Sequence, residues 1–150
     1  MGLKVGDKVP DFTAKDQHGV VFKWSEYLGK PAVIYFYPKD DTPGCTAQAC
    51  SFRDEYQDFK ELGAEVIGVS GDSEKSHVKF AQKYNLPFVL LSDKDKSLRK
   101  LFDVPTNLLG LIPGRVTYII DRAGIVVSIF NSMKATNHIP IALKAIQKMI

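Results

Sequence analysis

Both cysteines of this 150-residue chain lie in one stretch, residues 35–50: Tyr35-Phe36-Tyr37-Pro38-Lys39-Asp40-Asp41-Thr42-Pro43-Gly44-Cys45-Thr46-Ala47-Gln48-Ala49-Cys50. An apolar run of β-branched and aromatic residues, 32–37, leads into this stretch and predicts a strand buried on both faces. Thr42 suits the N-cap of a helix, and Pro43 suits its first position. We therefore expect a central strand that delivers Cys45 to the first turn of a helix.

The expected position of Cys45 favours its reactive form. The first backbone N–H groups of a helix have no partner within the helix and carry partial positive charge. In such an environment a thiol pKa can fall from about 8.5 to roughly 3.5–7.5. A lone cysteine is more often a small buried core residue. Here the Thr-Pro-Gly-Cys turn indicates a nucleophile, because packing alone does not require it.

The helical pattern continues from Pro43 to about Leu62, and Gly63 predicts the C-terminal end of this helix. One face of this helix is expected to meet the core, and it carries Cys45, Ala49, Phe52, Tyr56 and Phe59. Cys50 lies about 140° around the helix from Cys45, on a polar face. The first thiol is thus predicted to be sheltered and the second to face solvent.

The rest of the chain alternates predicted strands with predicted helices. Further strands are expected at residues 65–70, 88–91, 115–121 and 125–130, the last two as a hairpin, and helices at 74–84, 95–102 and 139–149. Residues 7–21 predict two short strands joined by a turn, and Ser25 to Leu28 a single helical turn. This order is typical of an α/β protein with a central mixed β-sheet flanked by helices.

Length and composition predict one domain over residues 1–150, because a chain of 150 residues with 45% hydrophobic content can bury one ordinary core. The net charge of +3 is small. The mixed run from Asp93 to Lys100 is therefore expected to be a solvated helix face and not a nucleic-acid patch. We expect no membrane insertion, since no segment reaches the roughly 18 apolar residues of a membrane span.

The histidines give no indication of a metal site. His18, His77 and His138 lie far apart, without the spacing of metal ligands. Each is expected to be a turn, helix-face or cap residue. Neither a metal nor another cofactor is expected, because a reactive pair of thiols needs none.

The cysteine stretch resembles the peroxiredoxins. Pro38, Thr42 and Cys45 match their Pro-x-x-x-Thr-x-x-Cys signature, and Cys50 is similar to the second cysteine of the peroxiredoxin Q group, also called bacterioferritin comigratory protein. The resemblance runs from Asp7 to the final helix, through residues 70–72, 84–88, 91–93 and 113–115. It implies a thioredoxin-like fold with an N-terminal β-hairpin extension.

The resemblance also implies a role for each matching residue. Cys45 would be the peroxidatic cysteine that becomes a sulfenic acid, Thr42 would contact thiolate and peroxide through its hydroxyl, and Pro38 would shield the pocket. Arg115 matches the arginine that lies far from the signature in sequence; without the resemblance it would read as an ordinary charge at a strand edge. Cys50 would be the resolving cysteine, which forms an intramolecular disulfide with Cys45.

Together these roles imply a thioredoxin-dependent thiol peroxidase. Its substrates would be hydrogen peroxide and alkyl hydroperoxides, its reductant thioredoxin or a similar dithiol, and its role antioxidant defence and redox homeostasis as a monomer. Gln48 sits where related sequences carry Glu or Gln, although such a residue is more often simply a polar helix position.

Two other classes of protein use paired thiols. A disulfide oxidoreductase of the thioredoxin type carries Cys-x-x-Cys, whereas four residues separate Cys45 from Cys50. Such an enzyme would also leave Thr42 and Arg115 without a role. A peroxide-sensing interaction protein could use the same two thiols, but it would need a partner surface, which the sequence does not plainly show.

The segment Leu109-Gly110-Leu111-Ile112-Pro113-Gly114-Arg115 is particularly similar to the plastid peroxiredoxin Q proteins, while bacterial relatives are cytoplasmic. The expected location is therefore the plastid (chloroplast) if the source is a photosynthetic eukaryote, and the cytoplasm otherwise.

Overall fold

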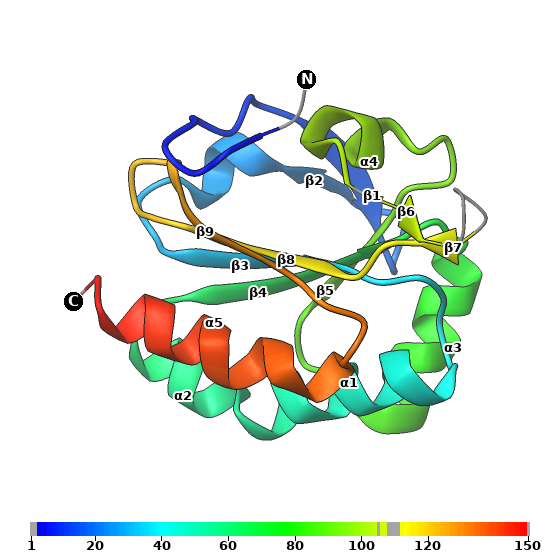
Figure 1. The fold of residues 1–150 in the computed structure, drawn as a ribbon. Helices are drawn as coiled ribbons and strands as arrows, with labels where there is room; N and C mark the ends of the chain where they lie inside the picture. Colours follow the sequence, from blue (N-terminus) through cyan, green and yellow to red (C-terminus); the bar gives the residue numbers. More distant parts are fainter. Residues whose placement is uncertain (1–2, 105, 108–111, 150) are drawn as a thin grey trace.

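A seven-stranded mixed sheet runs through the computed structural model, which describes residues 3–104, 106–107 and 112–149 (Figure 1). The strands are β1 (Thr13–Asp16), β2 (Val21–Lys23), β3 (Ala32–Phe36), β4 (Glu65–Ser70), β5 (Val89–Ser92), β8 (Val116–Ile120) and β9 (Val126–Asn131), with β6 (Thr106–Asn107) and β7 (Ile112–Pro113) as a separate pair. The helices are η1 (Trp24–Tyr27), α1 (Pro43–Asp54), α2 (Tyr56–Glu61), α3 (Glu74–Tyr84), α4 (Ser97–Phe102), η2 (Ala135–Asn137) and α5 (His138–Gln147). Leu109 to Leu111, part of the plastid-like segment, lie outside the described residues.

The strand before the cysteines is central, as predicted. The sheet order is β2-β1-β5-β4-β3-β8-β9, and β3 pairs in parallel with β4 and antiparallel with β8. All five residues of β3 are buried, because both faces of the sheet are covered. The order confirms the α/β prediction of a mixed sheet, and the β1–β2 and β8–β9 hairpins are confirmed as antiparallel pairs.

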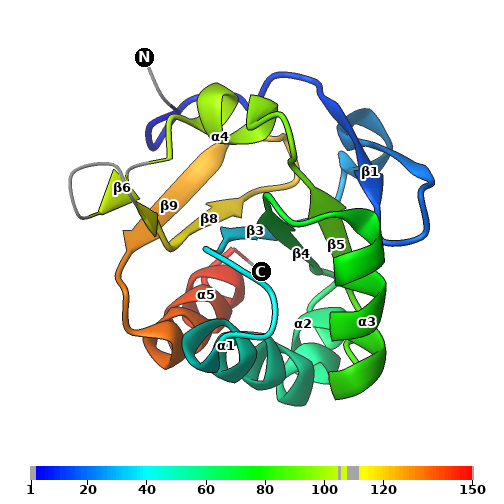
Figure 2. The same cartoon turned by 90° about the vertical axis from the view of Figure 1, so that its right-hand side faces the viewer.

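Two cores pack on opposite faces of the sheet. Alternate β3 residues point to opposite sides, so Ile34 and Phe36 join one core while Val33 and Tyr35 join the other. Helices α1, α2, α3 and α5 cover the second core, and the N-terminal hairpin, η1 and α4 cover the first (Figures 1 and 2). In the described part of the chain, no helix has both the length and the apolar character needed to cross a bilayer.

The prediction of a single helix from Pro43 to Leu62 is wrong, because the helix breaks at Glu55. This residue leaves helical geometry, with φ −97° and ψ 3°, so that α1 ends at Asp54 and α2 begins at Tyr56. The apolar stripe still continues across the break: Phe52 and Phe59 are both fully buried. The helical spacing of the apolar residues therefore continues through the break, although the backbone does not form one continuous helix.

The prediction of a solvated face from Asp93 to Lys100 is only partly correct. Asp93 and Leu98 are buried, at 1% and 3% exposure, and Arg99 is half-buried. Asp93 Oδ1 and Oδ2 accept the backbone N–H groups of Leu98 and Arg99 at 2.9 and 3.0 Å. The first charge of the run thus caps the start of α4 from inside the protein, while Lys100 remains exposed.

Candidate active site

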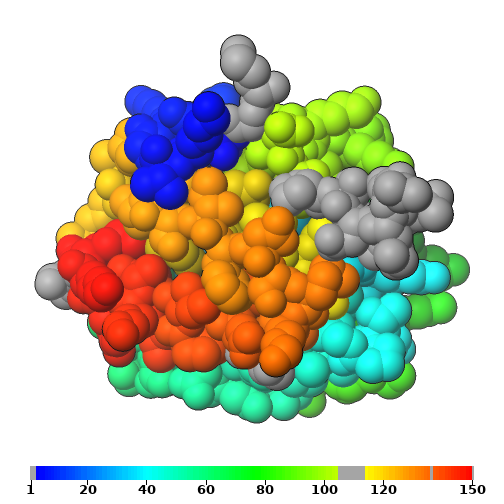
Figure 3. All heavy atoms as spheres, viewed as in Figure 1, coloured from blue at the N-terminus to red at the C-terminus, as the bar shows by residue number. Residues whose placement is uncertain are grey.

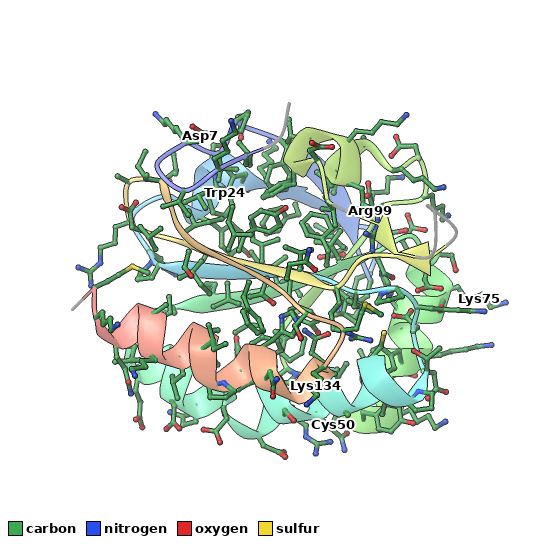
Figure 4. All side chains as sticks on the ribbon, in the orientation of Figure 1. Asp7, Trp24, Cys50, Lys75, Arg99 and Lys134 are labelled. Atoms are coloured by element: carbon green, nitrogen blue, oxygen red, sulfur yellow. The ribbon has the colours of Figure 1, made fainter. Side chains whose placement is uncertain are left out.

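Cys45 lies in the first turn of α1, and its side chain is only 1% exposed. Thr42 occupies the N-cap in extended conformation, with φ −100° and ψ 155°, and Pro43 opens the helix, as predicted. Cys50 is half-buried, on the side of the helix layer away from the sheet (Figure 4). Both thiols are free. The segment that leads into α1 reaches the surface, coloured cyan in Figure 3.

Arg115 brings a buried positive charge to Cys45. Its Nη2 lies 3.5 Å from Cys45 Sγ, and its side chain is 4% exposed. The sheet register explains this meeting, because Phe36, the last residue of β3, pairs with Val116, the first residue of β8. The chain therefore reaches Arg115 next to the point where β3 releases the cysteine loop. A guanidinium at this distance offers a fixed charge and N–H donors to a negative charge that forms on the sulfur or on an oxygen bound to it.

Gln48 completes the immediate surroundings of Arg115. Arg115 Nη1 donates a hydrogen bond of 2.6 Å to Gln48 Oε1, and Gln48 is fully buried one turn after Cys45. Gln48 is therefore a site residue and not an ordinary polar helix position. Its amide orients the guanidinium without neutralising the charge, which a carboxylate would do.

The side chains of Gln48 and Arg115 each keep one unpaired donor, Gln48 Nε2 and Arg115 Nε. In the described residues the buried side-chain nitrogen and oxygen atoms without a hydrogen-bond partner are Trp24 Nε1, Tyr35 OH, Gln48 Nε2 and Arg115 Nε. Buried polar atoms are nearly always paired, so unpaired donors beside a buried thiol call for an explanation. They are the groups that could bind an oxygen atom brought to Cys45.

Thr42 and Pro38 occupy the loop between β3 and α1. The Thr42 hydroxyl donates to the Lys39 carbonyl at 2.9 Å and does not cap its own helix. No hydrogen bond joins it to Cys45 in the described structure. Pro38 is half-buried. The Thr42 proton would therefore have to turn from Lys39 toward a bound substrate in order to act there.

A buried cluster that the sequence analysis missed holds this loop against α3. Asp40 Oδ2 lies 2.6 Å from His77 Nδ1 and 2.8 Å from Ser76 Oγ, and Asp40 Oδ1 accepts from Tyr37 OH at 2.6 Å. His77 Nε2 lies 3.0 Å from the Leu91 carbonyl, which can only accept, so Nε2 carries a proton. Asp40 thus fixes the loop two residues before Thr42.

Three potential metal ligands lie close together in this cluster: Asp40, Asp72 and His77, with ligand atoms within 4.8 Å of one another. Their atoms are engaged by the protein, since Asp72 Oδ2 accepts from Ser70 Oγ at 2.7 Å and from the Asp40 N–H at 2.8 Å. Burial and the Asp40 charge raise the pKa of Tyr37 well above its usual value, which keeps its phenol a donor. The cluster therefore serves as a clamp on the loop.

His138 is also structural. Its Nε2 lies 2.7 Å from the Ser132 carbonyl and its Nδ1 lies 2.6 Å from Thr117 Oγ1. Burial lowers the pKa of His138, so the neutral ring connects α5 to β8. His18 lies in the β1–β2 turn. The three histidines thus lie in a turn, on a helix face and at a helix start, which agrees with the sequence interpretation.

Comparison with known proteins identifies the family. The AhpC/TSA family matches residues 5–129. The chain is 51% identical over 145 residues to "Peroxiredoxin Q, chloroplastic" of Sedum lineare, covering 96% of this chain and 78% of that protein. This chain belongs to the peroxiredoxins of the AhpC/TSA family, in the peroxiredoxin Q group. The resemblance stated from the sequence is confirmed.

Solved structures of related peroxiredoxins share the whole fold. Peroxidoxin BcpB of Mycobacterium tuberculosis superposes with a TM-score of 0.91 at 35% identity, over 99% of each chain. The bacterioferritin comigratory protein of Xanthomonas campestris, solved in work on its alkyl peroxide reduction activity, superposes with a TM-score of 0.88 at 32% identity, over 98% of this chain and 97% of that one. The thioredoxin-like fold of this peroxiredoxin is therefore confirmed.

Gly44 leaves room for Arg115 in this peroxiredoxin. A Cβ at position 44 would lie 2.9 Å from Arg115 Nη2, so Gly44→Ala should displace the guanidinium from Cys45. Because alanine is favoured over glycine in helices by about 1 kcal/mol, the fold should tolerate the change. We expect oxidation of Cys45 by peroxide to slow by about tenfold, or about 1.4 kcal/mol, in stopped-flow measurements.

Ala47→Gly is the matched control for this prediction, since Ala47 is exposed on the same helix. This variant should lower the melting temperature without slowing the oxidation of Cys45. An undiminished rate in Gly44→Ala would contradict the argument that the space at Gly44 sets the position of Arg115.

The neutral amide of Gln48 leads to a second prediction. Gln48→Glu would place a carboxylate against Arg115 Nη1, where the 2.6 Å bond now ends, and would offset the charge that favours the thiolate. The pH profile of Cys45 alkylation by iodoacetamide should move to higher pH, because the added negative charge lies close to the thiol. Gln57→Glu adds the same charge on the exposed face of α2 and should leave the profile unchanged. If both variants gave the wild-type profile, the charge balance at Arg115 would be irrelevant.

Proposed function

We propose that this peroxiredoxin is a thioredoxin-dependent thiol peroxidase that reduces hydrogen peroxide and alkyl hydroperoxides. The observation that carries the proposal is the 3.5 Å contact between Arg115 Nη2 and the buried Cys45 Sγ, with the unpaired Gln48 Nε2 and Arg115 Nε among the same side chains. The reaction of a thiol with a peroxide needs a thiolate, fixed hydrogen-bond donors and a surface that excludes water.

In the first step, the Cys45 thiolate attacks the terminal oxygen of the hydroperoxide. The S–O bond forms as the O–O bond breaks, and the electron pair of the broken bond leaves on the second oxygen, which takes up a proton and departs as water or an alcohol. Cys45 becomes a sulfenic acid. Arg115 stabilises the charge that moves onto the oxygens, Thr42 orients the peroxide after its hydroxyl turns from Lys39, and Pro38 limits access of water.

In the second step, the Cys50 thiolate attacks the Cys45 sulfur. The S–S bond forms as the S–O bond breaks, and the hydroxyl group leaves as water after taking up a proton. In a regular helix residues five apart have Cα atoms about 8.6 Å from each other, whereas a disulfide requires roughly 4.4–6.8 Å. Part of α1 must therefore unwind before Cys45 and Cys50 can join.

The structure offers natural limits for this unwinding. The Asp40 clamp holds the loop before Thr42, and the break at Glu55 separates α1 from α2. Between these limits Gly44 loosens the first turn, which has the fewest intrahelical hydrogen bonds to lose. The segment that rearranges would thus be α1 itself, Pro43–Asp54, while the sheet and α2 stay folded.

In the third step a protein dithiol of the thioredoxin type reduces the disulfide and returns both thiols.

We infer that residues 1–150 act as one thioredoxin-like domain and as a monomer. The role would be antioxidant defence and redox homeostasis, with no nucleic-acid partner. Sedum lineare peroxiredoxin Q is named chloroplastic, which supports a plastid location if the source is photosynthetic, with the cytoplasm as the alternative.

The decisive experiment is peroxide consumption coupled to thioredoxin, thioredoxin reductase and NADPH. Catalytic turnover of hydrogen peroxide and of a small alkyl hydroperoxide would support the enzyme. Disulfide exchange that needs no peroxide would indicate an oxidoreductase instead, and a single stoichiometric oxidation would indicate a sensor. Either of these last two results would overturn the proposal.

Loss of the donors should slow the first step. Arg115→Ala should reduce the rate of Cys45 oxidation by about a hundredfold, because one donor to a developing charge is worth about 2.7–4 kcal/mol. Thr42→Val should cost less, about tenfold, since the hydroxyl is already bonded to Lys39. Stopped-flow oxidation measures both, with Arg122→Ala, at an exposed turn, as the control. Unchanged rates in both Arg115→Ala and Thr42→Val would contradict the roles assigned to Arg115 and Thr42.

A further inference from the structure

Arg99 makes contacts that a solvated helix charge would not make. From α4, its Nη2 donates to the Tyr37 carbonyl at 2.9 Å and its Nη1 to the Gly114 carbonyl at 3.5 Å. Its Cζ lies 5.6 Å from the centre of the Phe36 ring. Figure 4 shows Arg99 between α4 and the sheet. One planar guanidinium therefore connects the start of the cysteine loop with the segment that carries Arg115.

Each of the two carbonyls directly precedes a residue assigned to the reaction. Tyr37 is followed by Pro38, where the chain leaves β3 for the cysteine loop, and Gly114 is followed by Arg115. The guanidinium fork of Arg99 thus bridges these two backbone positions just beyond the β3–β8 pairing. A lysine has a single ammonium group and cannot present two donors in that fixed geometry.

The base of α4 holds Arg99 in place. Asp93 accepts the Arg99 backbone N–H at 3.0 Å, and Leu98 and Phe102 anchor the helix in the core at 3% and 1% exposure. Gly114 is buried as well. The Arg99 side chain therefore extends from a fixed backbone toward a fixed target, which is how positioning residues hold a site.

Arg99 stays charged in these surroundings. Burial lowers the pKa of Arg99, while the negative charge of Asp93 favours its protonated form. Burial raises the pKa of Tyr118 to about 12, so this phenol is neutral near pH 7 and adds no charge. The guanidinium of Arg99 therefore keeps all of its N–H donors for the two carbonyls.

We propose that Arg99 is a positioning residue of the peroxidase site, which holds the Pro38 loop and Arg115 in register around Cys45. This inference rests on the proposed function, since it assigns Arg99 to the same reaction. It adds a second arginine to the site. Unlike Arg115, which contacts the thiol, Arg99 touches neither the thiol nor the peroxide.

The test uses Arg99→Met, Arg99→Lys and the control Lys100→Met, all in a Cys50→Ser background so that Cys45 is the only thiol. Lys100 is an exposed cation on the same helix. Two quantities are measured: the rate of Cys45 oxidation by hydrogen peroxide, and the pH profile of its alkylation by iodoacetamide. Thermal unfolding is followed in parallel.

Arg99→Met should slow oxidation by about tenfold or more and move the alkylation profile to higher pH. Arg99→Lys, which keeps the charge but loses the fork, should keep the profile near that of the parent while oxidation still slows severalfold. Lys100→Met should change neither quantity. In an Arg115→Ala background the effect of Arg99→Met should shrink, because the two residues act as a unit.

Full reactivity of both Arg99 variants would overturn the proposal. So would a slower Arg99→Met with an unmoved profile and a lower melting temperature, which would indicate a merely structural role. If Arg99→Met does not fold, the rate of Arg99→Lys decides. Alkylation needs no peroxide, so it still tests Arg99 if the parent protein proves unreactive toward peroxide, a result that would overturn only the proposed function.

Discussion

Cys45→Ser is expected to abolish peroxide consumption completely while leaving the fold intact. A hydroxyl with a pKa far above that of a thiol offers no nucleophile at neutral pH, and oxygen cannot take up a second oxygen as sulfur does. The change is nearly isosteric, and the side chain is 1% exposed with Arg115 Nη2 nearby as a hydrogen-bond donor. The thermal unfolding midpoint should therefore stay close to that of the parent protein.

The measurement is peroxide loss in the thioredoxin-coupled assay, with Ser51→Ala as a matched control on the same helix. Ser51 is half-buried and has no assigned role. Mass spectrometry of the reduced protein after one equivalent of peroxide should place one added oxygen, or one disulfide, on Cys45 in the parent and none in Cys45→Ser. More than a trace of activity in Cys45→Ser would mean that another group reacts with the peroxide.

The local part of the site could be predicted from sequence because its causes are local. An apolar run fixed β3 in the centre of the sheet, and Thr42 and Pro43 marked the start of α1. Placing Cys45 in the first turn then follows from counting residues. The family resemblance added Arg115, which sits 70 residues further along the chain and has no local signal of its own.

The clamp and Arg99 were missed because they form only when α3 and α4 pack beside the segment that follows β3. Asp40 and His77 are 37 residues apart, and Arg99 and Tyr37 are 62 apart, so neither pair leaves a periodic pattern. The alternating charges around Asp93 favoured a solvated face, yet Asp93 is buried because it caps α4. One signal was available, since an aspartate just before a helix often accepts backbone N–H groups of the first turn. Asp93 does so here from inside the protein.

The break at Glu55 was missed for a different reason. Neither glycine nor proline marks it, and the apolar stripe runs through it from Phe52 to Phe59. Side-chain periodicity reports which residues meet the core, and it does not report whether every backbone hydrogen bond is present. The break nevertheless matters for the proposed cycle, because it lets α1 change shape without α2.

Cys50→Ser is expected to abolish thioredoxin-supported turnover while leaving the first reaction with peroxide at its normal rate. Without a resolving thiol, the Cys45 sulfenic acid cannot become an intramolecular disulfide. It should therefore persist, or advance to the sulfinic acid at excess peroxide. Stopped-flow oxidation, a sulfenic-acid probe and the coupled assay separate these outcomes. Full turnover in this variant, or a disulfide between Cys45 and another chain in the parent protein, would contradict the role of Cys50.

The same pair of proteins tests whether α1 unwinds. Because residues five apart in a helix are about 8.6 Å from each other, the oxidised parent must lose helical geometry between Cys45 and Cys50. Hydrogen exchange should accelerate over Pro43–Asp54 on oxidation, whereas α2 (Tyr56–Glu61) should stay protected. Cys50→Ser treated with one equivalent of peroxide should keep the exchange pattern of the reduced protein, since it cannot form the disulfide. Identical exchange in the oxidised and reduced parent would exclude unwinding, and acceleration that spreads through α2 would show that the break at Glu55 sets no limit.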